Sequence, residues 1–173
     1  MKNKLIKKPG VFLDRDGVIN YDYGYVHKIK DFKIRKGVIK GLRFLTKKGY
    51  LLFIITNQSG IAKGIFTEKE YKIFTKRIKK IFKKKGVFFK QIYYCPYHPK
   101  ATIKKYRKIT NLRKPGNLMI ENIRKKWKIN IKTSFMIGDK KTDQLAAKKS
   151  KIYFEYPKKN FSDQVKKILR MVI

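Results

Sequence analysis

The 173-residue sequence contains one cysteine, Cys95, and no long uninterrupted run of apolar residues. A single cysteine excludes a framework of intrachain disulfides and is typical of a protein in a reducing compartment. A membrane-spanning helix needs about 20 consecutive apolar residues, and no stretch approaches that length. The N-terminal segment is basic, but no apolar segment of signal-peptide length follows it. We therefore expect a soluble, cytoplasmic protein with no membrane partner.

Acidic residues are also scarce. The sequence contains 11 aspartates and glutamates and 47 lysines and arginines, which gives a formal net charge of +36. Such an excess attracts polyanions, so a nucleic-acid-binding protein is one interpretation. However, most of these cations are lysines, and they are spread over every predicted helix. Arginine, which recognises bases and phosphates better than lysine does, is the minority. Ile, Phe, Tyr, Asn and Lys are favoured by A/T-rich codons. We interpret the charge as codon composition and expect no specific nucleic-acid partner.

Apolar residues, in contrast, make up 42% of the sequence and are spread along its whole length. This distribution is typical of a globular protein and argues against disorder. The length fits one domain with a proper buried core. No internal repeat or low-complexity linker divides the chain. We predict a single domain over residues 1–173, without a separate cap domain, and a monomer.

Short apolar runs alternate with segments of helical periodicity. The runs have the length and composition of strands buried on both faces, as in a parallel sheet. They are Val11–Leu13, Leu51–Ile55, Ile92–Tyr94, Phe135–Ile137 and a candidate fifth, Ile152–Phe154. Helical patterns cover Gly37–Lys48, the segment from the capping pair Thr67 and Glu70 to Gly86, Leu118–Trp127, Thr142–Lys149 and Phe161–Met171. The alternation predicts an α/β fold with a doubly wound, mostly parallel sheet and helices on both faces.

Polar residues follow three of the predicted strands. Ligands of open α/β sheets bind beyond the carboxyl ends of the strands, so these residues should meet at one edge. They are Asp14 with Asp16, Thr56 to Ser59, and Gly138 with Asp139. Five of the seven aspartates fall within or near the first and last of these segments: Asp14, Asp16, Asp22, Asp139 and Asp143. In a chain so rich in lysine, this clustering predicts an acidic site.

The chemistry of that site follows from its carboxylates. Asp14 and Asp16 project to the same side of an extended backbone and repel each other unless a cation lies between them. Together with Asp139 they offer the hard oxygen ligands that Mg²⁺ prefers beside a substrate phosphate. Asp14 is then the candidate nucleophile of an aspartyl-phosphate intermediate, and Asp16 the candidate acid and base. Thr56 and Lys114 are candidates for stabilising the transferring phosphoryl group.

Four segments resemble, in order and in spacing, the motifs of the haloacid dehalogenase-like phosphatases. They are VFLDRDGVIN, FIITNQSG, RKP and MIGDKKTD, and they span residues 11–143. DYGYVH (22–27), TNQSGIAKG (56–64) and YYCPYHP (93–99) further resemble the D-glycero-D-manno-heptose-1,7-bisphosphate 7-phosphatases, in the histidinol-phosphatase-like branch. The resemblance implies that Asp14, the backbone carbonyl of Asp16 and Asp139 hold Mg²⁺. It assigns contacts with the substrate to Asp22, Tyr23, Gly24, Tyr25, Asn57, Gln58, Ser59, Arg113 and Lys140.

The resemblance implies a phosphatase that acts on a small phosphorylated sugar. Its reaction would remove the 7-phosphate of a heptose 1,7-bisphosphate, on the way to the nucleotide-activated heptose of lipopolysaccharide cores. A histidinol-phosphate phosphatase shares the first and last motifs, but does not typically combine DYGYVH with TNQSGIAKG. The alternative from another class is a basic nucleic-acid-binding protein or a polynucleotide end phosphatase that has lost activity. No RNA-binding aromatic motif or zinc finger supports it.

The segment Cys95–Gly116 departs from the family pattern. Members of the family commonly bind zinc there through four residues, of which this chain keeps Cys95, while His98 lies one residue off. The other three positions hold Tyr97, Thr110 and Leu112. A closed zinc site needs four ligands, so we expect no structural zinc. Apolar side chains would order the segment instead: Tyr97, Ile103, Tyr106, Ile109 and Leu112.

Three other polar residues have ordinary structural explanations. Asp143 lies near the start of a predicted helix, where a carboxylate caps the helix or forms a salt bridge more readily than it binds a metal. We interpret His27 and His98 as loop residues rather than as ligands or catalytic bases.

Overall fold

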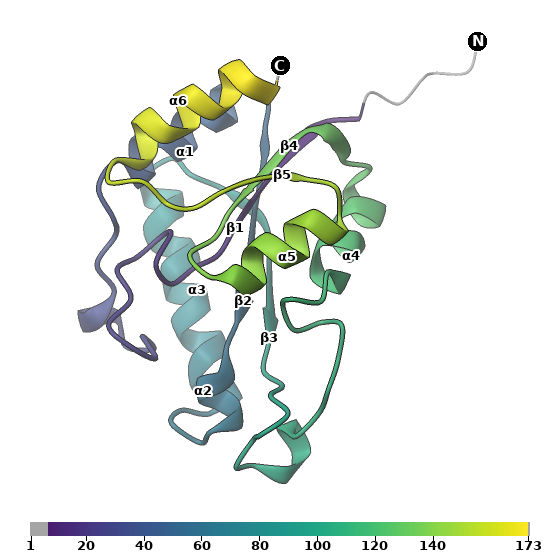
Figure 1. The fold of residues 1–173 in the computed structure, drawn as a ribbon. Helices are drawn as coiled ribbons and strands as arrows, with labels where there is room; N and C mark the ends of the chain where they lie inside the picture. Colours follow the sequence, from purple (N-terminus) through teal and green to yellow (C-terminus); the bar gives the residue numbers. More distant parts are fainter. Residues whose placement is uncertain (1–6, 173) are drawn as a thin grey trace.

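The computed structural model describes residues 7–172, and within them five parallel strands form one sheet in the order β3-β2-β1-β4-β5. The strands are β1 (Pro9–Leu13), β2 (Leu51–Asn57), β3 (Phe89–Cys95), β4 (Asn130–Ile137) and β5 (Tyr153–Glu155). Figure 1 shows the sheet between two layers of helices. The predicted α/β fold, with a doubly wound parallel sheet and helices on both faces, is confirmed.

The long helices occupy the segments that periodicity predicts. They are α1 (Val38–Lys47), α3 (Glu68–Lys84), α4 (Leu118–Trp127), α5 (Lys141–Lys149) and α6 (Phe161–Val172). The capping box of α3 is confirmed, because the Glu70 amide donates to Thr67 Oγ1 at 3.1 Å and the Thr67 amide donates to Glu70 Oε2 at 2.6 Å. The prediction missed the short helix α2 (Ser59–Ala62) and two 3₁₀ turns, η1 (Ile29–Asp31) and η2 (Lys104–Tyr106). Each is too short to show a period.

Every strand differs from its predicted run at one or both ends, since β1 begins at Pro9, β3 covers Phe89–Cys95, β4 begins at Asn130 and β5 covers Tyr153–Glu155. β2 continues through Thr56 and Asn57, which pair with Tyr94 and Cys95 of β3, so Thr56 belongs to the strand rather than to the loop after it. The fifth strand begins one residue later than predicted, at Tyr153. Pairing with a neighbouring strand sets these ends, and apolar composition alone does not report pairing.

The sheet separates two apolar cores. Val11 and Leu13 of β1 face the side covered by α1, α3 and α6, whereas Phe12 faces the side covered by α4 and α5. Figure 1 shows the two groups of helices on opposite sides of the strands. Because both faces of the sheet are buried, its strands read as continuous apolar runs rather than as alternating patterns.

A third apolar cluster lies beneath the long connection between β3 and α4. Its buried members are Ile61, Ala62, Phe66, Tyr71, Ala101 and Tyr106, with Tyr94, Tyr97 and Ile103 packed against them. Leu112 instead packs against the core formed by α4 and α5. Ile109 was expected to pack as well, but this expectation is wrong, because its side chain is 88% exposed.

A carboxylate ties this cluster to α3. Glu68, in the first turn of α3, accepts hydrogen bonds from the hydroxyls of Tyr94 and Tyr106, the latter at 2.9 Å. Tyr94 belongs to β3 and Tyr106 to the turn η2. Glu68 therefore holds a helix, a strand and the long connection together, in a segment where sequence resemblance would place a metal.

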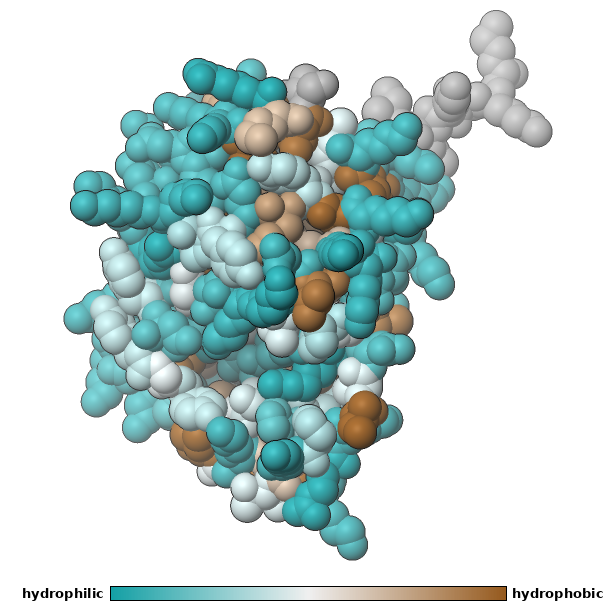
Figure 2. Space-filling model, in the orientation of Figure 1, coloured by the Kyte–Doolittle hydropathy of each residue, from teal (hydrophilic) through white to brown (hydrophobic). Residues whose placement is uncertain are grey.

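The surface is dominated by hydrophilic side chains. In the view of Figure 2, apolar residues occur as scattered patches among them. Within residues 7–172, every helix is too short or too polar to cross a bilayer.

Candidate active site

The carboxyl ends of β1, β2 and β4 meet at one edge of the sheet, where a cavity of about 310 Å³ opens. Asp14 follows β1 directly, Thr56 closes β2, and Gly138 with Asp139 follows β4. Most of the residues predicted for the site line this cavity: Asp14, Asp16, Asp22, Gly24, Tyr25, Thr56, Asn57, Gln58, Ser59, Lys114 and Lys140. The parallel topology thus gathers residues that are separated by up to 129 positions, Asp14 and Asp143, into one pocket.

Two predicted substrate contacts lie outside this lining. Tyr23 is 60% exposed and packs against Tyr21, with the Lys33 ammonium 5.7 Å from its ring centre. Arg113 is partly buried, and its Nη1 donates to the carbonyl of Tyr97 at 3.1 Å. Arg113 is thus held by the long connection that precedes it.

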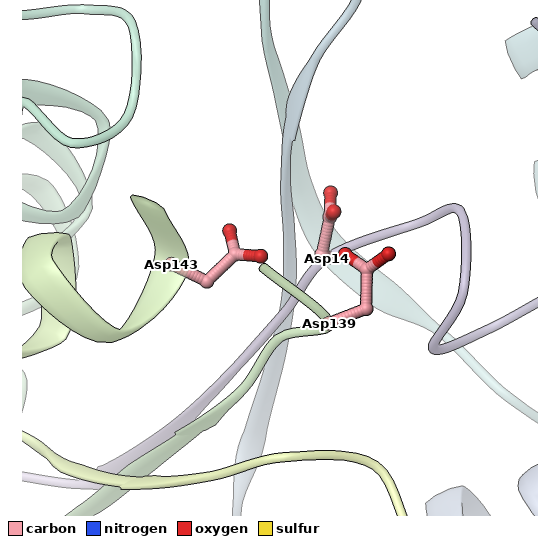
Figure 3. Close-up of side chains that lie close together, drawn as sticks. All are labelled: Asp14, Asp139 and Asp143. Atoms are coloured by element: carbon pink, nitrogen blue, oxygen red, sulfur yellow. The ribbon is translucent and has the colours of Figure 1, made fainter. Parts of the chain in front are cut away.

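Three carboxylates come together at the floor of the site. Oxygen atoms of Asp14, Asp139 and Asp143 lie within 4.8 Å of one another. Figure 3 shows these carboxylates turned toward a common point from the end of β1, the segment after β4 and helix α5. Burial raises the pKa of Asp139 to about 7, and the negative charge of Asp14 adds to the effect. The group therefore carries more negative charge than its surroundings compensate.

Two glycines permit this approach. Gly17 has a φ of 78°, and a Cβ there would come within 2.6 Å of the Asp139 carboxylate. A Cβ at Gly138 would lie 2.2 Å from the Asp143 Cβ. A side chain at either position would push an aspartate out of the group. The glycine of D-x-D-G is thus required by an aspartate that lies far away in the sequence.

Lys114 is the buried cation at the floor of the site, with 2% of its surface exposed. Its ammonium lies 3.0 Å from Asp14 Oδ1 and 2.6 Å from Asp143 Oδ1, and it donates to the carbonyl of Ile55 at 2.8 Å. Burial alone would lower the pKa of Lys114, but the two carboxylates outweigh burial and raise it. Asn57 fixes the Lys114 backbone by pairing its side-chain amide with both the amide and the carbonyl of that residue.

The donor set fits a divalent cation. The buried ammonium of Lys114 compensates one of the three negative charges, and the exposed ammonium of Lys140 lies 4.0 Å from Asp139 Oδ2, so the group stays net negative when all three carboxylates are ionised. Among the described residues, Asp139 Oδ1 is buried without any hydrogen-bond partner. An orphaned carboxylate oxygen in a buried acidic group is what a hard cation such as Mg²⁺ would bind.

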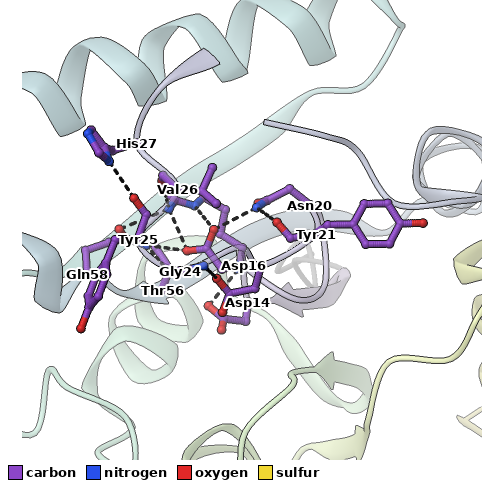
Figure 4. A network of polar contacts seen from close by, with 12 residues as sticks. Asp14, Asp16, Asn20, Tyr21, Gly24, Tyr25, Val26, His27, Thr56 and Gln58 are labelled. Atoms are coloured by element: carbon purple, nitrogen blue, oxygen red, sulfur yellow. Dashed lines mark hydrogen bonds and ion pairs between the residues drawn. The ribbon is translucent and has the colours of Figure 1, made fainter. Parts of the chain in front are cut away.

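Asp16 is oriented by a separate network, shown in Figure 4. Arg15, whose side chain is 2% exposed, donates Nη2 to Asp16 Oδ2 at 2.7 Å and Nε to Oδ1 at 3.1 Å. Asn20 and Gln58 donate two more hydrogen bonds to the same carboxylate, at 3.0 and 3.1 Å. Arg15 also donates to the carbonyl of Val26 at 2.7 Å, which ties the network to the loop after β1.

Sequence reasoning missed Arg15, whose guanidinium orients Asp16. Asp143 was expected to cap or form a salt bridge, and both are confirmed, because it accepts from the Lys140 amide at 3.0 Å and pairs with Lys114. Its place beside Asp14 and Asp139 agrees with the clustering of aspartates in the sequence. Gly60 and Thr142 also line the cavity, and both lie within the quoted motif segments, although neither was singled out. Arg15 did have a signal, since it is a charged residue at the end of an apolar strand.

The end of β3 and the long connection between β3 and α4 contain two potential zinc ligands, Cys95 and His98. Cys95 is buried, with Sγ 3.8 Å from the carbonyl of Tyr97, and burial raises the pKa of its thiol. Nδ1 of His98 accepts from the Lys100 amide at 3.1 Å. Cys95 and His98 belong to no group of three potential metal ligands found within residues 7–172.

Comparison with known sequences supports a phosphatase lineage. Residues 13–167 match the family model described as polynucleotide kinase 3 phosphatase. A D-glycero-beta-D-manno-heptose-1,7-bisphosphate 7-phosphatase of Photorhabdus laumondii is 47% identical over 144 residues, which are 83% of this chain and 77% of that protein. A D-glycero-alpha-D-manno-heptose-1,7-bisphosphate 7-phosphatase of the same organism is 43% identical over 141 residues, 82% of this chain and 77% of that one.

Comparison with solved structures supports the fold. A D,D-heptose 1,7-bisphosphate phosphatase from B. bronchiseptica, complexed with magnesium and phosphate, aligns with a TM-score of 0.81. The alignment covers 94% of this chain and 99% of that one at 20% sequence identity. At this identity the likeness concerns the arrangement of strands and helices.

Proposed function

Because this chain belongs to the heptose-1,7-bisphosphate 7-phosphatases, magnesium-dependent phosphomonoester hydrolases of the haloacid dehalogenase-like group, we propose that it removes the 7-phosphate of D-glycero-D-manno-heptose 1,7-bisphosphate. The observation that carries the proposal is the buried contact between Asp14 and Lys114 at the floor of a cavity lined by the family's motifs. The product would enter the route to nucleotide-activated heptose.

Asp14 is the nucleophile of the proposed reaction. One of its oxygens attacks the phosphorus, the bond to the sugar oxygen breaks, and an aspartyl phosphate forms. Lys114 holds Asp14 at 3.0 Å, and with Thr56 it places positive charge and a hydroxyl beside the phosphoryl oxygens. Water then attacks the phosphorus, releases inorganic phosphate and restores the Asp14 carboxylate.

Asp16 serves as acid and then as base. It gives a proton to the departing sugar oxygen and later takes one from the attacking water. All of its present hydrogen bonds come from Arg15, Asn20 and Gln58, so Asp16 must exchange one of them for a bond to the leaving oxygen. The Gln58 contact, at 3.1 Å, is the one on the cavity side.

Asp14, Asp139 and the backbone carbonyl of Asp16 would hold magnesium. A bound magnesium ion supplies positive charge that offsets the repulsion between these carboxylates and an incoming phosphate. Asp143 keeps Lys114 in place and so contributes indirectly. The residues proposed to bind the sugar are Asp22, Tyr23, Gly24, Tyr25, Asn57, Gln58, Ser59, Arg113 and Lys140, of which Tyr23 and Arg113 lie outside the cavity lining.

A panel of phosphate esters tests this function. The substrates are both anomers of heptose 1,7-bisphosphate, histidinol phosphate and a 3′-phosphorylated oligonucleotide, each assayed for phosphate release with magnesium and with a chelator. We expect the highest kcat/KM for a heptose bisphosphate, loss of the phosphate from C7, and no turnover with the chelator. A higher kcat/KM for histidinol phosphate or the oligonucleotide would assign the enzyme to that substrate instead. Asp14→Asn is the matched control for a contaminating phosphatase.

A further inference from the structure

The mouth of the cavity carries a cation that the chemistry at Asp14 does not use. Lys63 follows α2 and is exposed, and its ammonium donates to the Tyr25 hydroxyl at 2.6 Å. The same ammonium lies 5.2 Å from the centre of the Tyr25 ring. Because Tyr25 lines the cavity, this contact joins the segment after α2 to the loop after β1 across the rim of the site.

The backbone of the loop holds Tyr25 in this place. Its φ is 49°, in the left-handed region where a bulky side chain is strained. The amide of Gly24 donates to Asp22 Oδ1 at 2.9 Å, and the carbonyl of Tyr25 lies 2.7 Å from Nδ1 of His27. The surrounding contacts impose this unusual conformation, which indicates that the position of the Tyr25 ring matters.

Other cations act on the same imidazole as Lys63. Burial, followed by the positive charges of Arg113, Lys63 and Lys100, lowers the pKa of His98. Three cations thus act on one imidazole that lies on the long connection. Cations that lie close together repel one another, and an anion that binds among them relieves this repulsion.

We propose that Lys63, positioned by Tyr25, belongs to a subsite for the second, non-reacting phosphate of a bisphosphorylated substrate. This inference rests on the proposed function. With one phosphate beside Asp14, the remainder of the substrate extends toward the rim, where Lys63 lies. The ammonium exchanges the Tyr25 hydroxyl for a phosphate oxygen, and that hydroxyl becomes free to donate to the same phosphate. Hydrogen bonds between an ammonium and a phosphate are among the strongest that a protein makes.

This subsite would favour bisphosphates over monophosphates. Binding energy from a remote phosphate raises kcat/KM when it helps to orient the reacting phosphate. The informative quantity is therefore the ratio of kcat/KM for heptose 1,7-bisphosphate to that for heptose 7-phosphate. A general loss of stability or of catalytic chemistry lowers both values and leaves their ratio as it was.

Three variants and one control test the subsite. Lys63→Met removes the charge and keeps the aliphatic stem, Lys63→Arg keeps the charge, and Tyr25→Phe removes the hydroxyl that receives the ammonium. Lys104→Met is the control, since Lys104 is an exposed lysine of η2 in the long connection. We expect the ratio to fall by about tenfold to a hundredfold in Lys63→Met, to recover largely in Lys63→Arg, and to stay at the wild-type value in Lys104→Met.

The outcomes separate the subsite from the function. A wild-type enzyme that hydrolyses neither sugar phosphate contradicts the proposed function, and the subsite with it. A wild-type enzyme that prefers the bisphosphate, together with a Lys63→Met variant of unchanged ratio, contradicts the subsite alone. If the ratio of the two kcat/KM values falls as much in Lys104→Met as in Lys63→Met, the subsite is also contradicted, because net charge would then explain the preference for the bisphosphate. An intermediate ratio in Tyr25→Phe supports the positioning role of Tyr25.

Discussion

Lys114 compensates the buried charge of the catalytic cavity through contacts with Asp14 and Asp143. Lys114→Met would leave both carboxylates buried without their cation, so we expect the free energy of unfolding to fall by about 3–5 kcal/mol. Urea denaturation with and without magnesium measures the loss. Magnesium should restore part of the stability, because it neutralises the same carboxylates.

A second substitution checks this explanation. Adding Asp143→Asn to Lys114→Met removes one of the stranded charges, and the double variant should be more stable than Lys114→Met alone. If both variants unfold at the wild-type urea concentration, the site does not depend on this ion pair.

Asp14→Asn should stop turnover and leave the fold intact. The amide keeps the shape of the side chain but cannot attack phosphorus, so we expect kcat to fall by about 10³-fold or more. Phosphate release measures the activity, and circular dichroism with thermal unfolding confirms the fold. Wild-type turnover by the purified variant would refute the aspartyl-phosphate mechanism.

Sequence reasoning found the site residues that stand in a recognisable local sequence pattern. Asp14 and Asp139 each follow an apolar strand, and parallel strands end at one edge. Arg15 is placed by contacts with the Val26 carbonyl and the Gln58 side chain, the latter 43 positions away. Such contacts are decided by tertiary packing, which local patterns do not report.

Among the secondary-structure elements, α3 carries a contact whose effect on stability depends on pH. The Tyr94 hydroxyl, above all, lowers the pKa of Glu68 from its ordinary value of 4.5, burial opposes it, and Tyr106 and Lys72 add to the lowering. A carboxyl group with a lowered pKa in the folded state stabilises the protein above pH 4.5 and loses this effect as the pH falls through the folded-state value. Acid should therefore weaken the attachment of the long connection.

Glu68→Gln tests this contact. We expect the variant to lose stability at pH 7 and to show a smaller further decrease than the wild type between pH 5 and pH 3, measured by urea unfolding at each pH. Glu121→Gln is the control, since Glu121 forms a partly exposed pair with Arg124 within α4. Equal pH profiles for the wild type and Glu68→Gln would show that Glu68 does not bind the connection.

The connection after β3 is expected to contain no structural zinc. Cys95 supplies one thiolate, His98 binds the Lys100 amide through Nδ1, and Thr110 and Leu112 offer no strong ligand. Elemental analysis of the purified, untagged protein measures the metal content. Stoichiometric zinc whose removal unfolds the protein would contradict this prediction.

The strands and long helices were predictable because each has a local signature. Apolar runs mark strands buried on both faces, and Thr67 with Glu70 marks the start of α3. Which apolar side chains of the long connection are buried was not predictable from the sequence. Ile109 is as apolar as Ile103, yet Ile109 faces solvent while Ile103 packs against the third cluster. Which apolar side chain a loop buries depends on the path of its backbone.

At the scale of the whole molecule, the net charge of +36 should cause weak binding to any polyanion. If the charge reflects codon composition, oligonucleotides should bind with little sequence preference and with affinity that falls steeply as salt rises. Fluorescence anisotropy with oligonucleotides of several sequences, at about 50 to 200 mM salt, measures both the sequence preference and the salt dependence of binding. A nanomolar, sequence-selective complex at physiological salt would show a dedicated nucleic-acid function.

The strand order has a consequence for the newborn chain. β1 lies between β2 and β4, yet β4 begins only at Asn130. At roughly 5–20 residues per second, the ribosome needs about 6 to 23 seconds to reach β4 after β1 has been made. During that interval the central strand has an open, apolar edge to which other nascent chains could add. The lysines of α3 are synthesised within the same interval, and their like charges keep neighbouring chains apart before the sheet is complete.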